Sequence, residues 1–179
     1  MYCIGVDFMN KKLMKIVFTA LFMALCCAAT LISIPSPAST GYLNLGDCFV
    51  ILSGWMLGPV YGFLAGGIGS AISDLVLGYA VYAPATLVIK GLMAVIAYLA
   101  FTGLSKLIKN KPILPRIISG VFCEIIMIGG YFLYDSLLAG SFAPAVPGIP
   151  GNAVQGLFGI VVSTIIIGIL SKTKLKNRF

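Results

Sequence analysis

Four carboxylates and one lysine stand within or at the edges of long apolar stretches of this 179-residue chain. They are Asp47, Asp74, Lys90, Glu124 and Asp135. A charge near the centre of a bilayer costs about 2.5–3.5 kcal/mol on insertion scales, so each is expected to have a partner or a function. The sequence contains no histidine, metal-ligand cluster, nucleotide-binding motif or nucleophile–base pair. The pattern therefore indicates recognition of a ligand rather than enzymatic catalysis.

Asp74 and Lys90 flank a short connection between two expected helices, 60–77 and 85–108. Asp74 is near the end of the first, and Lys90 is about one and a half turns into the second. Because a short connection makes the two helices neighbours, these residues could form an ion pair. Two interpretations stay open: a structural salt bridge that ties the helices together, or a site in which one or both charges face a ligand.

Other polar residues gather in the same half of the expected bundle. Glu124 is roughly mid-span in its helix, and Tyr131 and Asp135 follow it toward the outer end. The remaining candidates lie in the first loop, around the 77–85 turn and at the start of the last helix: Tyr42, Asn44, Asp47, Tyr79, Tyr82, Thr86, Asn152 and Gln155. Each tyrosine alone could belong to an interfacial aromatic belt. Together the set predicts a pocket for a small ring compound, open to the outside.

The composition requires a membrane to position these groups. The chain is 60% hydrophobic and 9% charged, against about 25% charged in soluble domains. A span needs about 20 apolar residues in helical form, because lipid offers the backbone no hydrogen bonds. We predict an all-α fold, an integral membrane bundle of six transmembrane helices over residues 13–34, 47–57, 60–77, 85–108, 114–138 and 151–170. Segment 47–57 is short for a full span.

Basic residues orient this bundle. The net charge of +7 is concentrated in Lys11–Lys15, Lys106–Arg116 and Lys172–Arg178. Even numbers of crossings separate the three clusters, so the positive-inside rule places both termini in the cytoplasm. We expect a cytoplasmic tail over residues 1–12, a membrane domain over 13–171 and a basic tail over 172–179. Residues 1–10 are expected to be unstructured, and the first helix to be retained rather than cleaved as a signal peptide. A nucleic-acid partner is not indicated, because no aromatic–basic face accompanies the charges.

Small residues mark two helix surfaces. Ala20, Ala24 and Ala28 recur every four residues, a spacing that permits close helix approach. This stripe serves either internal packing or a partner protein. Gly62, Gly66 and Gly69 form a similar surface on the 60–77 helix, which we interpret as internal packing.

Several motifs give the chain a family resemblance. They are Tyr42-Leu43-Asn44-Leu45-Gly46-Asp47, Leu57-Gly58-Pro59, the glycine-rich stretch from Gly62 to Asp74, and Gly78 to Thr86 followed by Lys90-Gly91. With them the chain resembles the substrate-binding S component of an energy-coupling factor (ECF) vitamin transporter, over essentially Lys12 to Lys174.

The resemblance implies a membrane protein that captures a vitamin or precursor from outside, in the cell membrane of a prokaryote, with the first loop as a lid. It implies no cofactor of its own. Two ABC-type ATPases would use ATP, and a transmembrane coupling subunit would dock on the alanine stripe and allow the component to topple in the membrane. The first-loop and tyrosine–alanine–proline motifs are most similar to the riboflavin and pyridoxine or hydroxymethylpyrimidine branch. We favour a pyridoxine-like or hydroxymethylpyrimidine-like substrate, with riboflavin next.

The resemblance also assigns positions. The lid would use Asn44 and Asp47, the pocket wall Asp74, Tyr82, Thr86 and Lys90, and the last two helices Glu124, Tyr131, Asn152 and Gln155. Three alternatives remain: a self-sufficient small carrier or channel, a membrane enzyme or assembly factor, and a purely structural subunit.

Overall fold

The computed structural model describes residues 11–35, 42–109 and 113–172. Its elements, in chain order, are α1 (Lys11–Leu31), β1 (Ser33–Pro35), β2 (Tyr42–Asn44), α2 (Gly46–Leu57), α3 (Pro59–Phe63), η1 (Leu64–Ile68), α4 (Gly69–Val76), α5 (Ala83–Leu107), α6 (Ile113–Ala139), η2 (Ala143–Ala145) and α7 (Gly148–Leu170). Because α3, η1 and α4 follow one another without a break, they make one span, Pro59–Val76. The predicted all-α bundle of six helices is confirmed; within the described ranges, five helices are long and apolar enough to cross a membrane and one is shorter.

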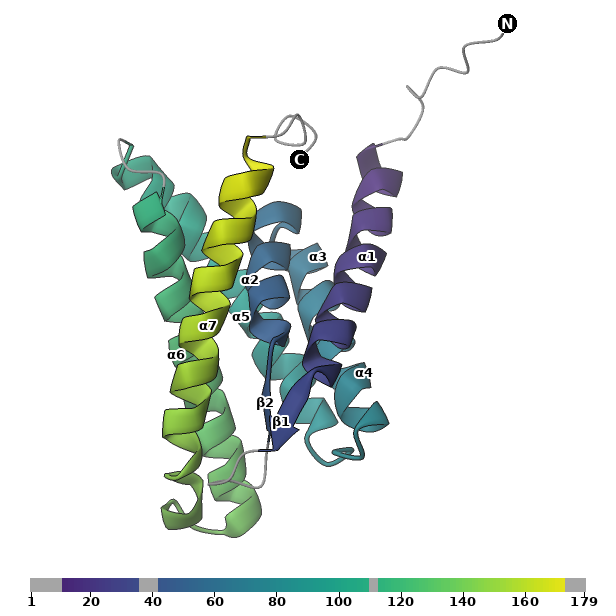
Figure 1. The fold of residues 1–179 in the computed structure, drawn as a ribbon, viewed down its shortest axis with the longest axis vertical. Helices are drawn as coiled ribbons and strands as arrows, with labels where there is room; N and C mark the ends of the chain where they lie inside the picture. Colours follow the sequence, from purple (N-terminus) through teal and green to yellow (C-terminus); the bar gives the residue numbers. More distant parts are fainter. Residues whose placement is uncertain (1–10, 36–41, 110–112, 173–179) are drawn as a thin grey trace, which may run out of the picture.

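The helices run roughly along the long axis of the molecule, and the start of α1 and the end of α7 lie at the same end (Figure 1). Helix α2 occupies the middle of the bundle, where it packs against α1, α3, α5 and α7. Close packing depends on Gly54, because a Cβ there would lie 2.2 Å from the Ala94 carbonyl oxygen of α5. Val50, Ile51 and Leu52 of α2 are almost completely buried, which places the apolar core around this helix.

Helix α2 is too short to cross a bilayer alone. Its 12 residues extend about 18 Å at 1.5 Å per residue, whereas the hydrocarbon core is about 30 Å thick. The strand before α2 in the chain, β2, extends from the start of this helix toward the end of the bundle opposite the basic end (Figure 1). This strand pairs antiparallel with β1, where Leu43 lies opposite Ile34. This short ribbon also ends α1 at Leu31 rather than at the predicted residue 34.

The glycine-rich helix packs internally, as its spacing predicted. Its central turn, η1, is a π-helix, which the sequence did not predict. A Cβ at Gly67 would lie 2.5 Å from the Leu87 carbonyl oxygen, and one at Gly69 would lie 2.5 Å from the Met23 carbonyl oxygen. The helix therefore fits between α5 and α1 only because Gly67 and Gly69 have no side chain.

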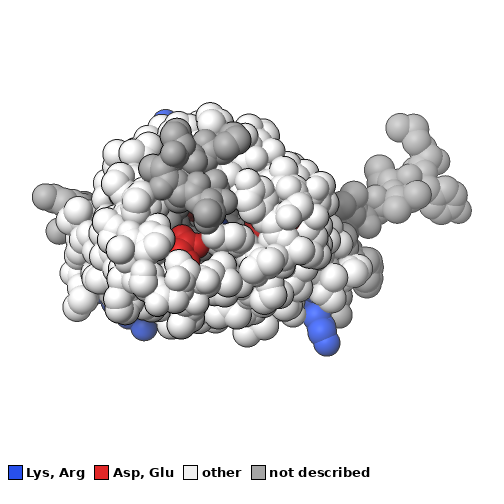
Figure 2. All heavy atoms as spheres, turned by 90° about the horizontal axis from the view of Figure 1, so that it is seen from below, with Lys and Arg blue, Asp and Glu red and all other residues white. Residues whose placement is uncertain are grey.

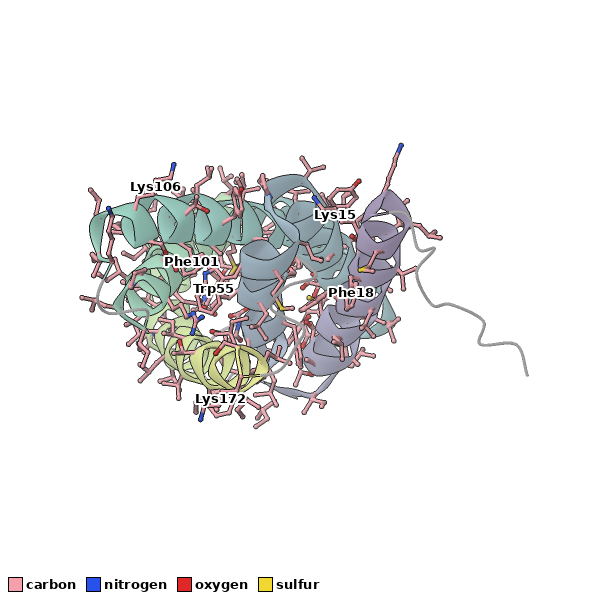
Figure 3. The ribbon with its side chains drawn as sticks, turned by 90° about the horizontal axis from the view of Figure 1, so that it is seen from above. Lys15, Phe18, Trp55, Phe101, Lys106 and Lys172 are labelled. Carbon is pink, nitrogen blue, oxygen red and sulfur yellow. The ribbon has the colours of Figure 1, made fainter. Side chains whose placement is uncertain are left out.

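The end of the bundle where α1 starts and α7 ends is basic. Figure 3 views the bundle from this end and shows Lys15, Lys106 and Lys172 on three different parts of the chain. Toward the bundle axis, Trp55 lies beside Phe101, with ring centroids 6.0 Å apart. The Trp55 indole donates a hydrogen bond to the Ser119 hydroxyl at 3.1 Å. Which side of the membrane this end faces stays a prediction. Of the expected tails over 1–12 and 172–179, residues 1–10 and 173–179 lie outside the described residues, and α1 already begins at Lys11.

Candidate substrate-binding site

A polar cavity lies at the end of the bundle opposite the basic end. It is lined by Thr30, Tyr42, Leu43, Asn44, Asp74, Tyr79, Tyr82, Thr86, Lys90, Tyr131, Asp135, Asn152 and Gln155. These residues come from α1, β2, the α4–α5 segment, α6 and α7. Viewed from this end, acidic side chains lie in a hollow of a largely uncharged surface (Figure 2). The cavity volume is about 40 Å³, room for about three water molecules, so a ring compound requires side chains to move.

Ten of the twelve predicted site residues line this cavity. The exceptions are Asp47 and Glu124. Two lining residues, Thr30 and Leu43, were not singled out from the sequence, and a third, Asp135, was noted with the converging polar residues but not assigned to the site. Thr30 and Leu43 lie in apolar surroundings that gave no signal, whereas the charge of Asp135 near the end of its helix was a usable one.

The buried lysine is paired, but with a different carboxylate from the one expected. Lys90 forms an ion pair with Asp47, and both side chains are 1% exposed. The sequence-based pairing of Lys90 with Asp74 is therefore wrong. The reason is that α2 packs directly on α5, which brings Asp47 in the first turn of α2 to the ammonium group of Lys90.

A glutamine fixes this ion pair in place. The Gln155 side-chain amide donates to Asp47 Oδ2 at 2.6 Å, and its oxygen accepts from the Asn44 backbone N–H at 2.8 Å. The Asn44 side chain in turn accepts from the Gly46 N–H at 2.8 Å. This network joins α2, α5, α7 and β2, so Asp47 acts behind the cavity wall rather than in it.

The other two carboxylates at the cavity are held by tyrosines. Tyr42 donates to Asp74, and Tyr82 donates to Asp135 at 2.8 Å. Burial, and then the hydrogen bond to Asp74, raise the pKa of the Tyr42 phenol well above its ordinary value, so Tyr42 remains a donor. Asp74 is 2% exposed. Its second oxygen, Oδ2, is buried and has no hydrogen-bond partner among the described residues.

Aromatic rings surround these carboxylates. Tyr42 and Tyr79 have ring centroids 4.9 Å apart, and Tyr79 and Tyr82 have centroids 6.2 Å apart. Tyr131 shares a 3.0 Å hydrogen bond with Thr86, and its ring lies 5.5 Å from the Lys90 nitrogen. Tyr42, Tyr79, Tyr82 and Tyr131 all line the cavity, so aromatic rings are present where a ring compound would bind.

Glu124 lies deeper, between α6 and α7. It is 5% exposed, and neither carboxylate oxygen has a hydrogen-bond partner in the described part of the chain. A Cβ at Gly156 would lie 2.7 Å from Glu124 Oε2, and one at Gly159 would lie 2.9 Å from Asp47 Cβ and 3.0 Å from Glu124 Oε1. Glu124 is therefore adjacent to Asp47 and does not contribute to the cavity lining.

The alanine stripe faces outward. Ala20, Ala24 and Ala28 are all exposed, while Phe22 and Cys26 on the opposite side of α1 are buried. The stripe therefore does not serve packing within this chain. It leaves a smooth surface on α1 for lipid or a partner helix.

A helical membrane bundle with a polar, tyrosine-lined cavity at one end defines a membrane-embedded binding protein. Comparison with known families gives a match over residues 10–172 to the family described as ECF-type riboflavin transporter, S component. The chain belongs to this family, whose members are transporter components and not enzymes.

Individual proteins are also similar to this chain. An uncharacterised protein of Pyrococcus woesei is 37% identical over 139 residues, 78% of this chain and 88% of that protein. The thiamine precursor transporter HmpT of Lactococcus lactis is 27% identical over 172 residues, 95% of each protein. A solved structure, described as the S component of a bacterial ECF transporter, superposes with a TM-score of 0.63. It is 19% identical and covers 89% of this chain and 96% of its own, which confirms the fold.

Proposed function

We propose that this protein captures a small vitamin or vitamin precursor in the tyrosine-lined cavity and delivers it as the S component of an ECF-type importer. The observation that carries this proposal is the convergence of ten predicted recognition residues on one cavity at one end of the bundle. Outside capture follows from the basic end being cytoplasmic by the positive-inside rule.

The proposed substrate is a pyridoxine-like or hydroxymethylpyrimidine-like ring, with riboflavin next. The relative named as a thiamine precursor transporter supports a precursor of this size. The small cavity, about 40 Å³, also favours a single ring over the three fused rings of riboflavin, because fewer side chains must move to admit it.

Delivery would depend on partners. We propose that a transmembrane coupling subunit docks on the exposed surface of Ala20, Ala24 and Ala28, and that two ABC-type ATPases supply ATP to topple the protein and release its cargo inside. The protein itself would need no cofactor. The packing of Trp55 with Phe101 near the basic end disfavours the alternative of an open channel.

The first experiment is binding. The purified full chain in detergent is titrated by calorimetry with pyridoxine, hydroxymethylpyrimidine, riboflavin and other vitamins. Submicromolar one-to-one binding of one compound supports capture. Absence of binding by protein shown to be folded contradicts it, and uptake into liposomes containing this chain alone would favour a self-sufficient carrier.

A further inference from the structure

The charges at the cavity do not balance. Three charged residues line it, namely Asp74, Lys90 and Asp135. Lys90 is neutralised by Asp47 in an ion pair that is fully buried. Asp74 and Asp135 each accept a hydrogen bond from a tyrosine hydroxyl, which is uncharged and does not neutralise them. Within the described residues, the cavity therefore presents two carboxylates with no cation committed to them.

One of these carboxylates has unused hydrogen-bonding capacity. Asp74 lines the polar cavity, and its buried Oδ2 has no hydrogen-bond partner in the residues described. A buried carboxylate oxygen without a partner is costly, and hydrogen bonds to charged groups are worth about 1.5–3 kcal/mol. A donor on a ligand is the partner that such a site lacks.

The aromatic surroundings favour the same kind of ligand. Tyr42, Tyr79 and Tyr82 form a continuous set of tilted and edge-on contacts, with centroids 4.9 and 6.2 Å apart. Tyrosine faces attract cations placed within about 6 Å of the ring centroid. The 5.5 Å approach of Lys90 to Tyr131 shows the same arrangement inside the protein.

We propose that this cavity selects a positively charged or protonated nitrogen heterocycle, whose N–H groups bond Asp74 and Asp135 while its ring lies against the tyrosines. This inference rests on the proposed capture function and names its substrate class. It predicts discrimination against anions, because a phosphate ester would meet two carboxylates and, among the described residues, no cation outside the Lys90–Asp47 ion pair.

The titratable groups around the ligand come from several elements. They are Asp74 of α4, Lys90 of α5 with Asp47 of α2 behind it, Tyr131 and Asp135 of α6, Glu124 of α6 at greater depth, and the tyrosines Tyr42, Tyr79 and Tyr82. A pH response of binding must therefore be separated from titration of the protein by using probes that differ only in basicity.

The test compares three probes on the full-length protein in detergent by calorimetry. They are 4-amino-5-hydroxymethyl-2-methylpyrimidine, its less basic 4-hydroxy counterpart and the phosphate ester of the amino compound. The amino probe should bind at least about tenfold more tightly than the hydroxy probe. That ratio corresponds to the weaker end of a charge-assisted bond. Its Kd should rise as the pH passes above the probe's own pKa and level off near the Kd of the hydroxy probe, because the protonated form binds more tightly than the neutral one.

Variants locate the effect. Asp74→Asn and Asp135→Asn should each weaken the amino probe by roughly tenfold or more and reduce its advantage over the hydroxy probe. Ser136→Ala is the matched control, since Ser136 adjoins Asp135 but donates to the Phe132 carbonyl oxygen of its own helix at 2.6 Å. This control should leave all three affinities unchanged.

The outcomes separate the two proposals. If the hydroxy probe or the phosphate ester binds as tightly as the amino probe, the cation inference is overturned and capture stands. The same holds if riboflavin binds below micromolar Kd without dependence on pH or on the two aspartates. If folded protein binds none of these probes and none of the wider vitamin panel, capture itself is contradicted.

Discussion

Breaking the Lys90–Asp47 ion pair should be the most damaging change at a polar position in the described part of the bundle. Both side chains are 1% exposed, so neither charge can turn to water when its partner is removed. Lys90→Met leaves Asp47 with only the Gln155 amide, and Asp47→Asn leaves Lys90 without its counter-ion. Removal of one partner of a buried pair costs about 3–5 kcal/mol.

The double variant Asp47→Asn/Lys90→Met should recover much of this loss. No charge is then left unpaired, and an asparagine can still accept the hydrogen bond from Gln155. Replacement of a whole buried pair by uncharged groups is often close to neutral. The sum of the two single losses should therefore exceed the loss of the double variant by about 2 kcal/mol or more.

The measurement is the free energy of unfolding in mixed detergent–dodecyl sulfate micelles, for wild type, the two single variants and the double variant. If a single variant does not accumulate, recovery of folded protein in the double variant is the readout. Asp74→Asn combined with Lys90→Met is the matched control, and its coupling should be clearly smaller. Additive losses for the Asp47 pair, or stronger coupling to Asp74, would refute the assignment.

Three further changes test other parts of the structure. Gly67→Ala should lower the free energy of unfolding by about 1–3 kcal/mol, because its Cβ would lie 2.5 Å from the Leu87 carbonyl oxygen; Gly168→Ala, which meets nothing within 4 Å, is the control. Glu124→Gln should not lower the free energy of unfolding, since the amide keeps the shape of the side chain without its charge. A decrease of more than about 1 kcal/mol would show that the carboxylate has a partner. Ala24→Leu should leave the melting temperature unchanged and abolish co-purification with the coupling subunit; retained co-purification would remove the stripe from the docking surface.

The membrane spans could be predicted because length and apolarity determine them almost alone. An uninterrupted apolar run of about 20 residues has few alternatives to a helix in lipid. The ribbon of β1 and β2 could not be predicted in this way. Three residues per strand are too few to show alternation, and the pairing of Ile34 with Leu43 is a tertiary contact.

The cavity was partly predictable for a related reason. Polar residues are easy to recognise in an apolar helix. The helix ends on one side of the membrane lie near one another in a bundle, so most of the lining residues could be assigned to one site. The partner of Lys90 could not be predicted from the sequence, because it depends on the packing of α2 against α5. The sequence separation favoured Asp74, whereas packing brings Asp47, 43 residues away, into contact.

That separation has a consequence for synthesis of the protein. Asp47 leaves the ribosome 43 residues before Lys90, which at about 5–20 residues per second is roughly 2–9 s earlier. During this interval the short α2 has no counter-ion for its carboxylate, and the later α5 brings a lysine that is costly to insert alone. Stable insertion of α2 and α5 therefore has to be a joint event, delayed until the second of them has been made. A chain truncated before residue 90 should be retained at the insertion machinery or degraded.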